Sequence, residues 1–63
     1  MKLVELHVAN SGSLFAINPE EVVRIGCIVD DKGSPEGTFV RSSDGTSIDV
    51  REDYQAVKEA LTK

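Results

Sequence analysis

The break at Asn18 and Pro19 most constrains how this chain can fold, because it ends one apolar run and opens the longest one, at residues 22–29. The Asn18 side chain can cap a short turn, and Pro19 fixes the backbone of the first turn residue. Glu20 and Glu21 follow, where the exposed amides of such a turn favour negative charge. The sequence therefore predicts a strand that stops at this break, a tight turn, and a long strand after it.

Alternation of apolar and polar residues predicts two further strands before the break. Residues 2–8 alternate, with Val4, Leu6 and Val8 on one side and Glu5 and His7 on the other. A loop at 9–13 separates this segment from an apolar run at 14–17, which predicts a hairpin. In the long strand at 22–29 one parity is expected to face the core, and it comprises Val23, Ile25, Cys27 and Val29. Gly26 interrupts that strand, which indicates a bulge or a close neighbour.

The second half of the chain predicts a second hairpin and a helix. Residues 30–37 are rich in glycine and charge, which predicts a flexible loop before a strand at 38–42. Asp44-Gly45 then indicates a tight turn into a strand at 46–50. From residue 52 or 53 onward, Tyr54, Val57 and Leu61 follow helical spacing and are expected to dock on the sheet or on a second copy.

These elements predict one α+β domain over residues 1–63. We expect a small antiparallel sheet or open roll of about five strands, with one C-terminal helix covering a face or an end. A chain of 63 residues buries a thin core, and its single cysteine excludes an internal disulfide. Self-association is a common remedy for so small a domain, so a homodimer is one expectation.

Charge and hydropathy narrow the classes of partner. The net charge of −4 and the pI near 4.7 argue against a general nucleic-acid binder, whose affinity rests on clustered Lys and Arg. No apolar run approaches the roughly 20 residues that span a bilayer, and the N-terminal residues lack the pattern of a signal peptide. The expected location is the cytoplasm.

The residues that bear chemistry do not form a catalytic pattern. His7 has no evident partner and is expected on the surface, with a pH-sensitive contact as the alternative, and Cys27 is expected in the core. One histidine and one cysteine cannot supply the ligands of a zinc site, and the acidic residues at 30–36 lack the spacing of a calcium loop. We therefore expect no metal, no cofactor and no enzymatic activity.

Two arginines and one aromatic residue are the candidate partner-binding residues. Arg24 and Arg41 lie in predicted strands, and on one sheet face they could hold an acidic partner or a phosphate backbone. The alternative is that they balance acidic neighbours across the sheet. Phe39 lies close to Arg41, and if exposed it is the best candidate for an interaction hot spot.

The order of these motifs resembles the FlbD family of small proteins associated with bacterial flagella and swarming. The matching residues run from the hairpin through the Asn-Pro-acidic segment and the second hairpin to the helix: Ile17, Asn18, Pro19, Glu20, Val22, Ile25, Thr38, Phe39, Val40, Asp44, Gly45, Ile48, Val50, Glu52, Val57 and Leu61. The resemblance implies a non-enzymatic accessory or regulatory protein that acts through protein contacts.

Three hypotheses about function follow. The first is a small cytoplasmic interaction module that binds a protein partner. The second is a DNA-binding regulatory domain, because the progression of elements is also similar to the LytTR domain; it predicts that Arg24, Arg41 and Arg51 converge on one face. The third is a phage or mobile-element protein that binds a host protein. An enzyme would instead require a concave pocket that holds His7 beside a carboxylate.

Overall fold

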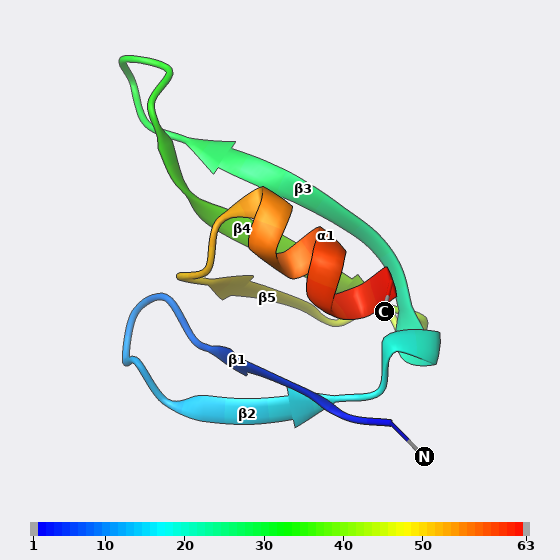
Figure 1. The fold of residues 1–63 in the computed structure, drawn as a ribbon. Coiled ribbons are helices and arrows are strands. Elements are labelled where there is room, and N and C mark those ends of the chain that lie inside the picture. The colour runs from blue at the N-terminus through cyan, green and yellow to red at the C-terminus, as the bar shows by residue number, and fades with distance from the viewer. Residues whose placement is uncertain (1, 63) are drawn as a thin grey trace.

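The computed structural model describes residues 2–62, which form a small α+β fold (Figure 1). Its elements in chain order are β1 (Val4–His7), β2 (Leu14–Ile17), the 3-10 turn η1 (Pro19–Glu21), β3 (Val22–Val29), β4 (Pro35–Ser42), β5 (Ser47–Val50) and α1 (Tyr54–Thr62). The predicted fold class, with five strands and a C-terminal helix, is confirmed.

The strands form two small antiparallel sheets that meet along β1 and β5. One sheet is the β1–β2 hairpin and the other has the order β3-β4-β5. An isolated bridge pairs Val8 with Val50. Beside it, the Ala9 N–H donates to the Asp49 carbonyl at 2.8 Å and the Arg51 N–H donates to the His7 carbonyl at 3.0 Å. Among the described residues, β2 and β3 are therefore the outermost strands.

The core lies between the two sheets and α1. Its buried side chains come from four strands or helices: Val4, Leu6, Val40, Val50 and Val57. Phe15, Ile17 and Ile48 pack around them from the strands, and Ala60 and Leu61 from the helix. α1 contacts β3 and β4, and so closes the inner face of the larger sheet. Thr38 is also fully buried, and its hydroxyl donates to the Glu52 carbonyl at 2.9 Å, which satisfies the polar group.

The turn at Asn18 forms as the sequence predicts. The Asn18 side-chain oxygen accepts the Glu20 N–H at 3.0 Å, and Pro19 is the first residue of η1. The Glu21 carboxylate accepts the Ser43 hydroxyl at 2.8 Å, and the Glu21 carbonyl accepts the Ser43 N–H at 2.7 Å. These bonds fix the start of β3 against the β4–β5 turn.

The expectation that one parity of β3 faces the core is wrong for most of the strand. Val23 is 63% exposed and Val29 is 53% exposed, and Cys27 is exposed rather than a core residue. A register shift between Val22 and Arg24 turns Val22, instead of Val23, to the side of Ile25. Farther along, the β3–β4 hairpin projects past α1 (Figure 1), so the helix does not cover Cys27 and Val29, which are both exposed.

The two turns of the larger sheet differ in how well the sequence predicts them. The loop predicted at 30–37 is shorter, because β4 already begins at Pro35 and the Asp30 side chain holds the turn by accepting the N–H groups of Lys32 and Ser34, each at 2.9 Å. Pro35 is tolerated because it lies beyond the part of β4 that pairs with β5. The Asp44-Gly45 turn is confirmed, with Gly45 at φ +92°.

The helix α1 begins at Tyr54, one or two residues later than the pattern predicts, and Asp53 is its cap. The Asp53 carboxylate accepts the Ala56 N–H at 2.7 Å. Val57 is fully buried, whereas Tyr54 is 37% exposed and so docks on the sheet less completely than the pattern predicts. Helical side chains lean toward the N-terminus, so Tyr54 at the first position extends past the core. Within residues 2–62, no helix has the length and apolar character that crossing a membrane requires.

Candidate functional site

The outer face of β3 and β4 brings together all three residues that the sequence singles out for partner binding. Antiparallel pairing places Arg24 directly opposite Arg41, and Gly26 opposite Phe39. Because side chains alternate along a strand, Phe39 and Arg41 share the face that points away from the buried Val40. Arg24, Phe39 and Arg41 therefore form one contiguous surface, which we call the arginine face.

Phe39 lies across the glycine of the neighbouring strand. A side-chain carbon at Gly26 would overlap the Phe39 ring, so the space above Gly26 is filled by that ring. This explains why β3 carries a glycine at its centre, as one of the two sequence interpretations expects. Phe39 is consequently half-buried.

The arginine face also carries an acidic residue, Asp49, which lies opposite Phe39 on β5 but forms no ion pair with either arginine. Arg24 and Arg41 are both exposed, and neither forms an ion pair or a side-chain hydrogen bond with another residue of the described part of the chain. The alternative that they balance acidic neighbours across the sheet therefore lacks a contact here. Like charges directly opposite each other repel, so the pair is locally unfavourable in the free chain.

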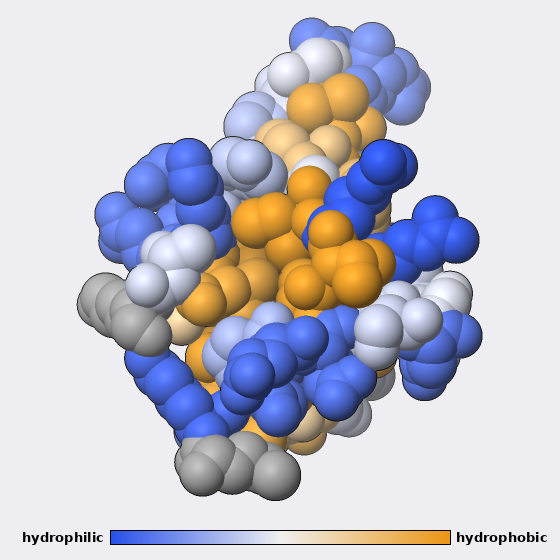
Figure 2. All heavy atoms as spheres, turned by 90° about the vertical axis from the view of Figure 1, so that its right-hand side faces the viewer, coloured by the Kyte–Doolittle hydropathy of each residue, from blue (hydrophilic) through white to orange (hydrophobic). Residues whose placement is uncertain are grey.

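An apolar groove adjoins the arginine face, between β3 and the C-terminal half of α1. It has a volume of about 260 Å³. Figure 2 shows the apolar surface on this side of the molecule, with hydrophilic side chains around it. The lining residues are Pro19, Val22, Val23, Arg24, Ile25, Lys58, Leu61 and Thr62.

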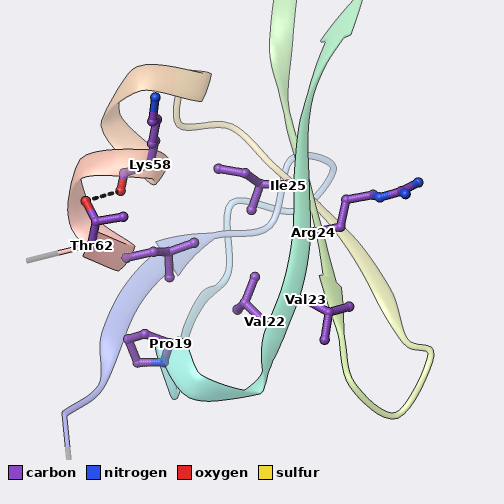
Figure 3. Close-up of a pocket in the computed structure, with 8 residues that line it drawn as sticks. Pro19, Val22, Val23, Arg24, Ile25, Lys58 and Thr62 are labelled. Atoms are coloured by element: carbon purple, nitrogen blue, oxygen red, sulfur yellow. Dashed lines mark hydrogen bonds between the residues drawn. The ribbon is translucent and has the colours of Figure 1, made fainter.

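The side chains of β3 divide between the two sides of the strand at this groove. In Figure 3, Val22 and Ile25 point toward α1, whereas Val23 and Arg24 point to the other side. Lys58 stands on the helix, and its backbone carbonyl accepts the Thr62 hydroxyl at 2.9 Å. A ligand at the edge of β3 would thus meet an apolar inner side and a cationic outer side.

The edge of β3 next to the groove is free. In its sheet β3 pairs with β4, and no backbone hydrogen bond within residues 2–62 joins β3 to another strand. An edge strand presents alternate N–H and C=O groups that can pair with an added strand. Because β3 has eight residues, this edge is long for so small a sheet.

Arg51 does not join Arg24 and Arg41. Its guanidinium lies against Gly12 in the β1–β2 turn, and its backbone is tied to the carbonyl of His7. Arg41 pairs with Ser47, the first residue of β5, and Arg51 directly follows the last residue of that strand. Ser47 and Arg51 are four residues apart, which is roughly 13 Å at strand spacing. The structure thus brings together two of the three arginines that a DNA-binding domain was expected to gather.

His7 has a partner that the sequence does not reveal. Its ring Nδ1 lies 2.8 Å from Glu52 Oε2, and its N–H donates to both Glu52 oxygens at 3.0 and 3.2 Å. Of the two expectations for His7, the structure therefore favours the alternative of a contact over a surface residue without a partner. The residues are 45 positions apart, so neither periodicity nor spacing could have linked them.

The His7–Glu52 pair joins the end of β1 to the segment between β5 and α1. Partial burial raises the pKa of Glu52, but the hydrogen bonds from the His7 side chain and N–H outweigh this and leave its pKa below the ordinary value of 4.5. Neither the groove beside α1 nor a second hollow, lined by Ala9, Asn10, Ile28, Glu36, Asp49 and Val50, includes His7. Among residues 2–62, no group of His, Cys, Asp and Glu side chains is arranged to hold a metal ion.

Comparison of the chain with known protein families, with curated proteins and with solved structures finds no match. The arrangement of the site is therefore the basis on which its function is inferred. Sequence reasoning found the arginine face but missed Val23, Lys58 and Leu61 as groove residues. Val23 was assigned to the core because the alternation gives no sign of the shift in register at Val22.

Proposed function

We propose that this chain is a small, non-enzymatic interaction module that binds a protein partner through the edge of β3, the groove beside it and the arginine face. The observation that carries the proposal is the free eight-residue edge of β3, flanked by an apolar groove and two arginines without acidic partners. The resemblance to FlbD proteins implies the same kind of role, and the cytoplasm remains the predicted location.

Two features favour a protein over a nucleic acid as the partner. The chain has only seven basic residues, and the arginine face gathers two of them, whereas affinity for a phosphate backbone rests on larger clusters of Lys and Arg. The groove is also mostly apolar, with five aliphatic or proline side chains among its eight lining residues. Apolar side chains in a groove are typical of protein interfaces, whereas nucleic-acid interfaces are more polar and strongly positive.

An affinity capture with matched variants tests the proposal. The tagged full chain, Arg24→Glu and Lys32→Glu are each incubated with a nuclease-treated bacterial lysate. Lys32→Glu is the control, because Lys32 is exposed in the β3–β4 turn and the change in charge is identical. We expect the same proteins with wild type and Lys32→Glu, and their loss with Arg24→Glu. Retention of those proteins by Arg24→Glu would contradict the proposed surface.

The same preparation tests the alternative function. The wild-type chain is also incubated with untreated lysate, to see whether it recovers nucleic acid. If it does, if the recovered material disappears after nuclease treatment, and if Arg24→Glu does not recover it, the chain is a nucleic-acid binder instead. That outcome would favour the DNA-binding hypothesis, with Arg24 and Arg41 as the contacts to phosphate.

A further inference from the structure

We propose that the partner presents an extended acidic segment, which adds as a strand to the free edge of β3 and alternates acidic with apolar side chains. This inference rests on the proposed function and specifies the chemistry of the partner. It follows from three properties of the β3 edge: its unpaired backbone, the different chemistry of its two sides, and its charge.

The backbone of β3 defines the geometry of the ligand. Main-chain groups on an open edge bind another extended chain by the same hydrogen bonds that join strands within a sheet. The register shift at Val22 and Arg24 bends the strand at the groove, so the regular part of the edge runs from Arg24 to Ile28. An added segment of about five residues matches that length.

The two sides of β3 define the alternation of the ligand. Successive side chains of a strand point to opposite faces of the sheet. On the inner side an added strand would meet Val22, Ile25 and Leu61 in the groove. On the outer side it would meet Arg24, with Arg41 directly behind it. In the added segment, apolar residues at one parity would match the groove, and acidic residues at the other parity would match the arginines.

Charge complementarity favours an acidic partner over a second copy of the chain. Two of the seven basic residues, Arg24 and Lys58, line the groove at this edge, and Arg41 lies opposite Arg24 on β4. The side chains of these three residues make no ion pair with another residue in 2–62. The lining of the groove contains no acidic residue. A two-fold pairing of β3 strands centred at Arg24 would place the arginines of two copies together, which like-charge repulsion disfavours.

A peptide titration tests this inference with the full chain. The probe is a synthetic peptide that alternates glutamate with valine, and the control peptide has lysine in place of every glutamate. Binding is followed by the amide shifts of the isotope-labelled protein. We expect the glutamate peptide to shift residues 22–29 and 58–61, to bind at least about tenfold more tightly than the lysine peptide, and to weaken as salt increases.

Variants of the protein make the result specific to the edge. Arg24→Gln should weaken binding of the glutamate peptide about tenfold, whereas Lys32→Gln should change it less than about twofold. Unchanged amide shifts of the core residues Val40 and Val57 show that each variant is folded. Equal binding of both peptides, or shifts centred on another surface, would overturn the inference.

Self-association is measured in the same samples. If dilution of the protein without peptide shifts residues 22–29, the edge binds a second copy and the acidic-peptide inference is wrong. The capture experiment tests the proposed function separately from this inference. If the glutamate peptide fails to bind but Arg24→Glu still loses the captured proteins, the inference is wrong and the interaction module is still supported.

Discussion

At the scale of single residues, the Arg24–Arg41 pair is a locally unfavourable feature of the larger sheet. Cross-strand positions favour opposite charges, yet this sheet places two arginines directly opposite each other on an exposed face. Such local conflicts are expected at functional sites, where binding supplies the compensation. A carboxylate from a partner would offset both charges at once.

The conflict predicts a variant that gains stability and loses binding. Arg41→Glu places a negative charge opposite Arg24, and should raise the free energy of unfolding by about 0.5 kcal/mol. It should also abolish capture of the protein partner, because the cationic surface is gone. Urea unfolding measures the first effect and affinity capture the second. A variant that is less stable and still binds would argue against the interpretation of the pair.

The His7–Glu52 contact predicts a pH dependence of stability. In the folded chain the pKa of Glu52 lies below its ordinary value of 4.5, so the folded state binds a proton less readily than the unfolded state. The contribution to stability is complete above pH 4.5 and is lost as the pH falls through the lower folded value. Glu52→Gln should therefore cost about 1 kcal/mol near neutral pH and reduce the acid dependence below 4.5.

Glu5→Gln is the control for this prediction. Glu5 is exposed on the same strand as His7, and its substitution removes the same charge as Glu52→Gln. Unfolding in urea at several pH values gives both curves. If Glu52→Gln lost stability equally at every pH, or matched Glu5→Gln near neutral pH, the contact with His7 would not contribute as described.

At the scale of elements, the sequence predicts the strands that have clear punctuation and fails where tertiary contacts decide. β2 and β3 have the predicted bounds because Asn18 and Pro19 mark the boundary between them. The start of β4 was missed, since Pro35 and Gly37 are typical of loops. Pairing with Val29 across the hairpin holds Pro35 in the strand, and local composition does not reveal this pairing.

The helix gives a direct test of which side of α1 packs on the sheet. Val57 is fully buried, so Val57→Ala should lower the free energy of unfolding by about 2 kcal/mol. Tyr54 lies on the same helical stripe but remains 37% exposed, so Tyr54→Ala should lower the free energy of unfolding by about 1 kcal/mol or less, a smaller loss than for Val57→Ala. Urea unfolding of both variants measures the difference. A larger loss for Tyr54→Ala would contradict the packing of the helix.

At the scale of the whole molecule, a small core supports a projecting edge. The described chain extends 39 × 22 × 21 Å, and the β3–β4 hairpin accounts for its elongation (Figure 1). The sequence anticipated the α+β fold and the three residues of the arginine face. The groove and the His7–Glu52 pair could not be anticipated, because each joins segments that are distant in sequence and meet through the packing of the hairpins and the helix.

The most direct test of the account is hydrogen exchange of the full chain, alone and bound to a captured partner protein. We predict that binding slows exchange across residues 22–29, because an added strand pairs with the open amides of β3. Exchange in the β1–β2 hairpin should stay unchanged. Protection confined to that hairpin or to the turn at 30–34, with no change at 22–29, would contradict the claim that the edge of β3 is the binding surface.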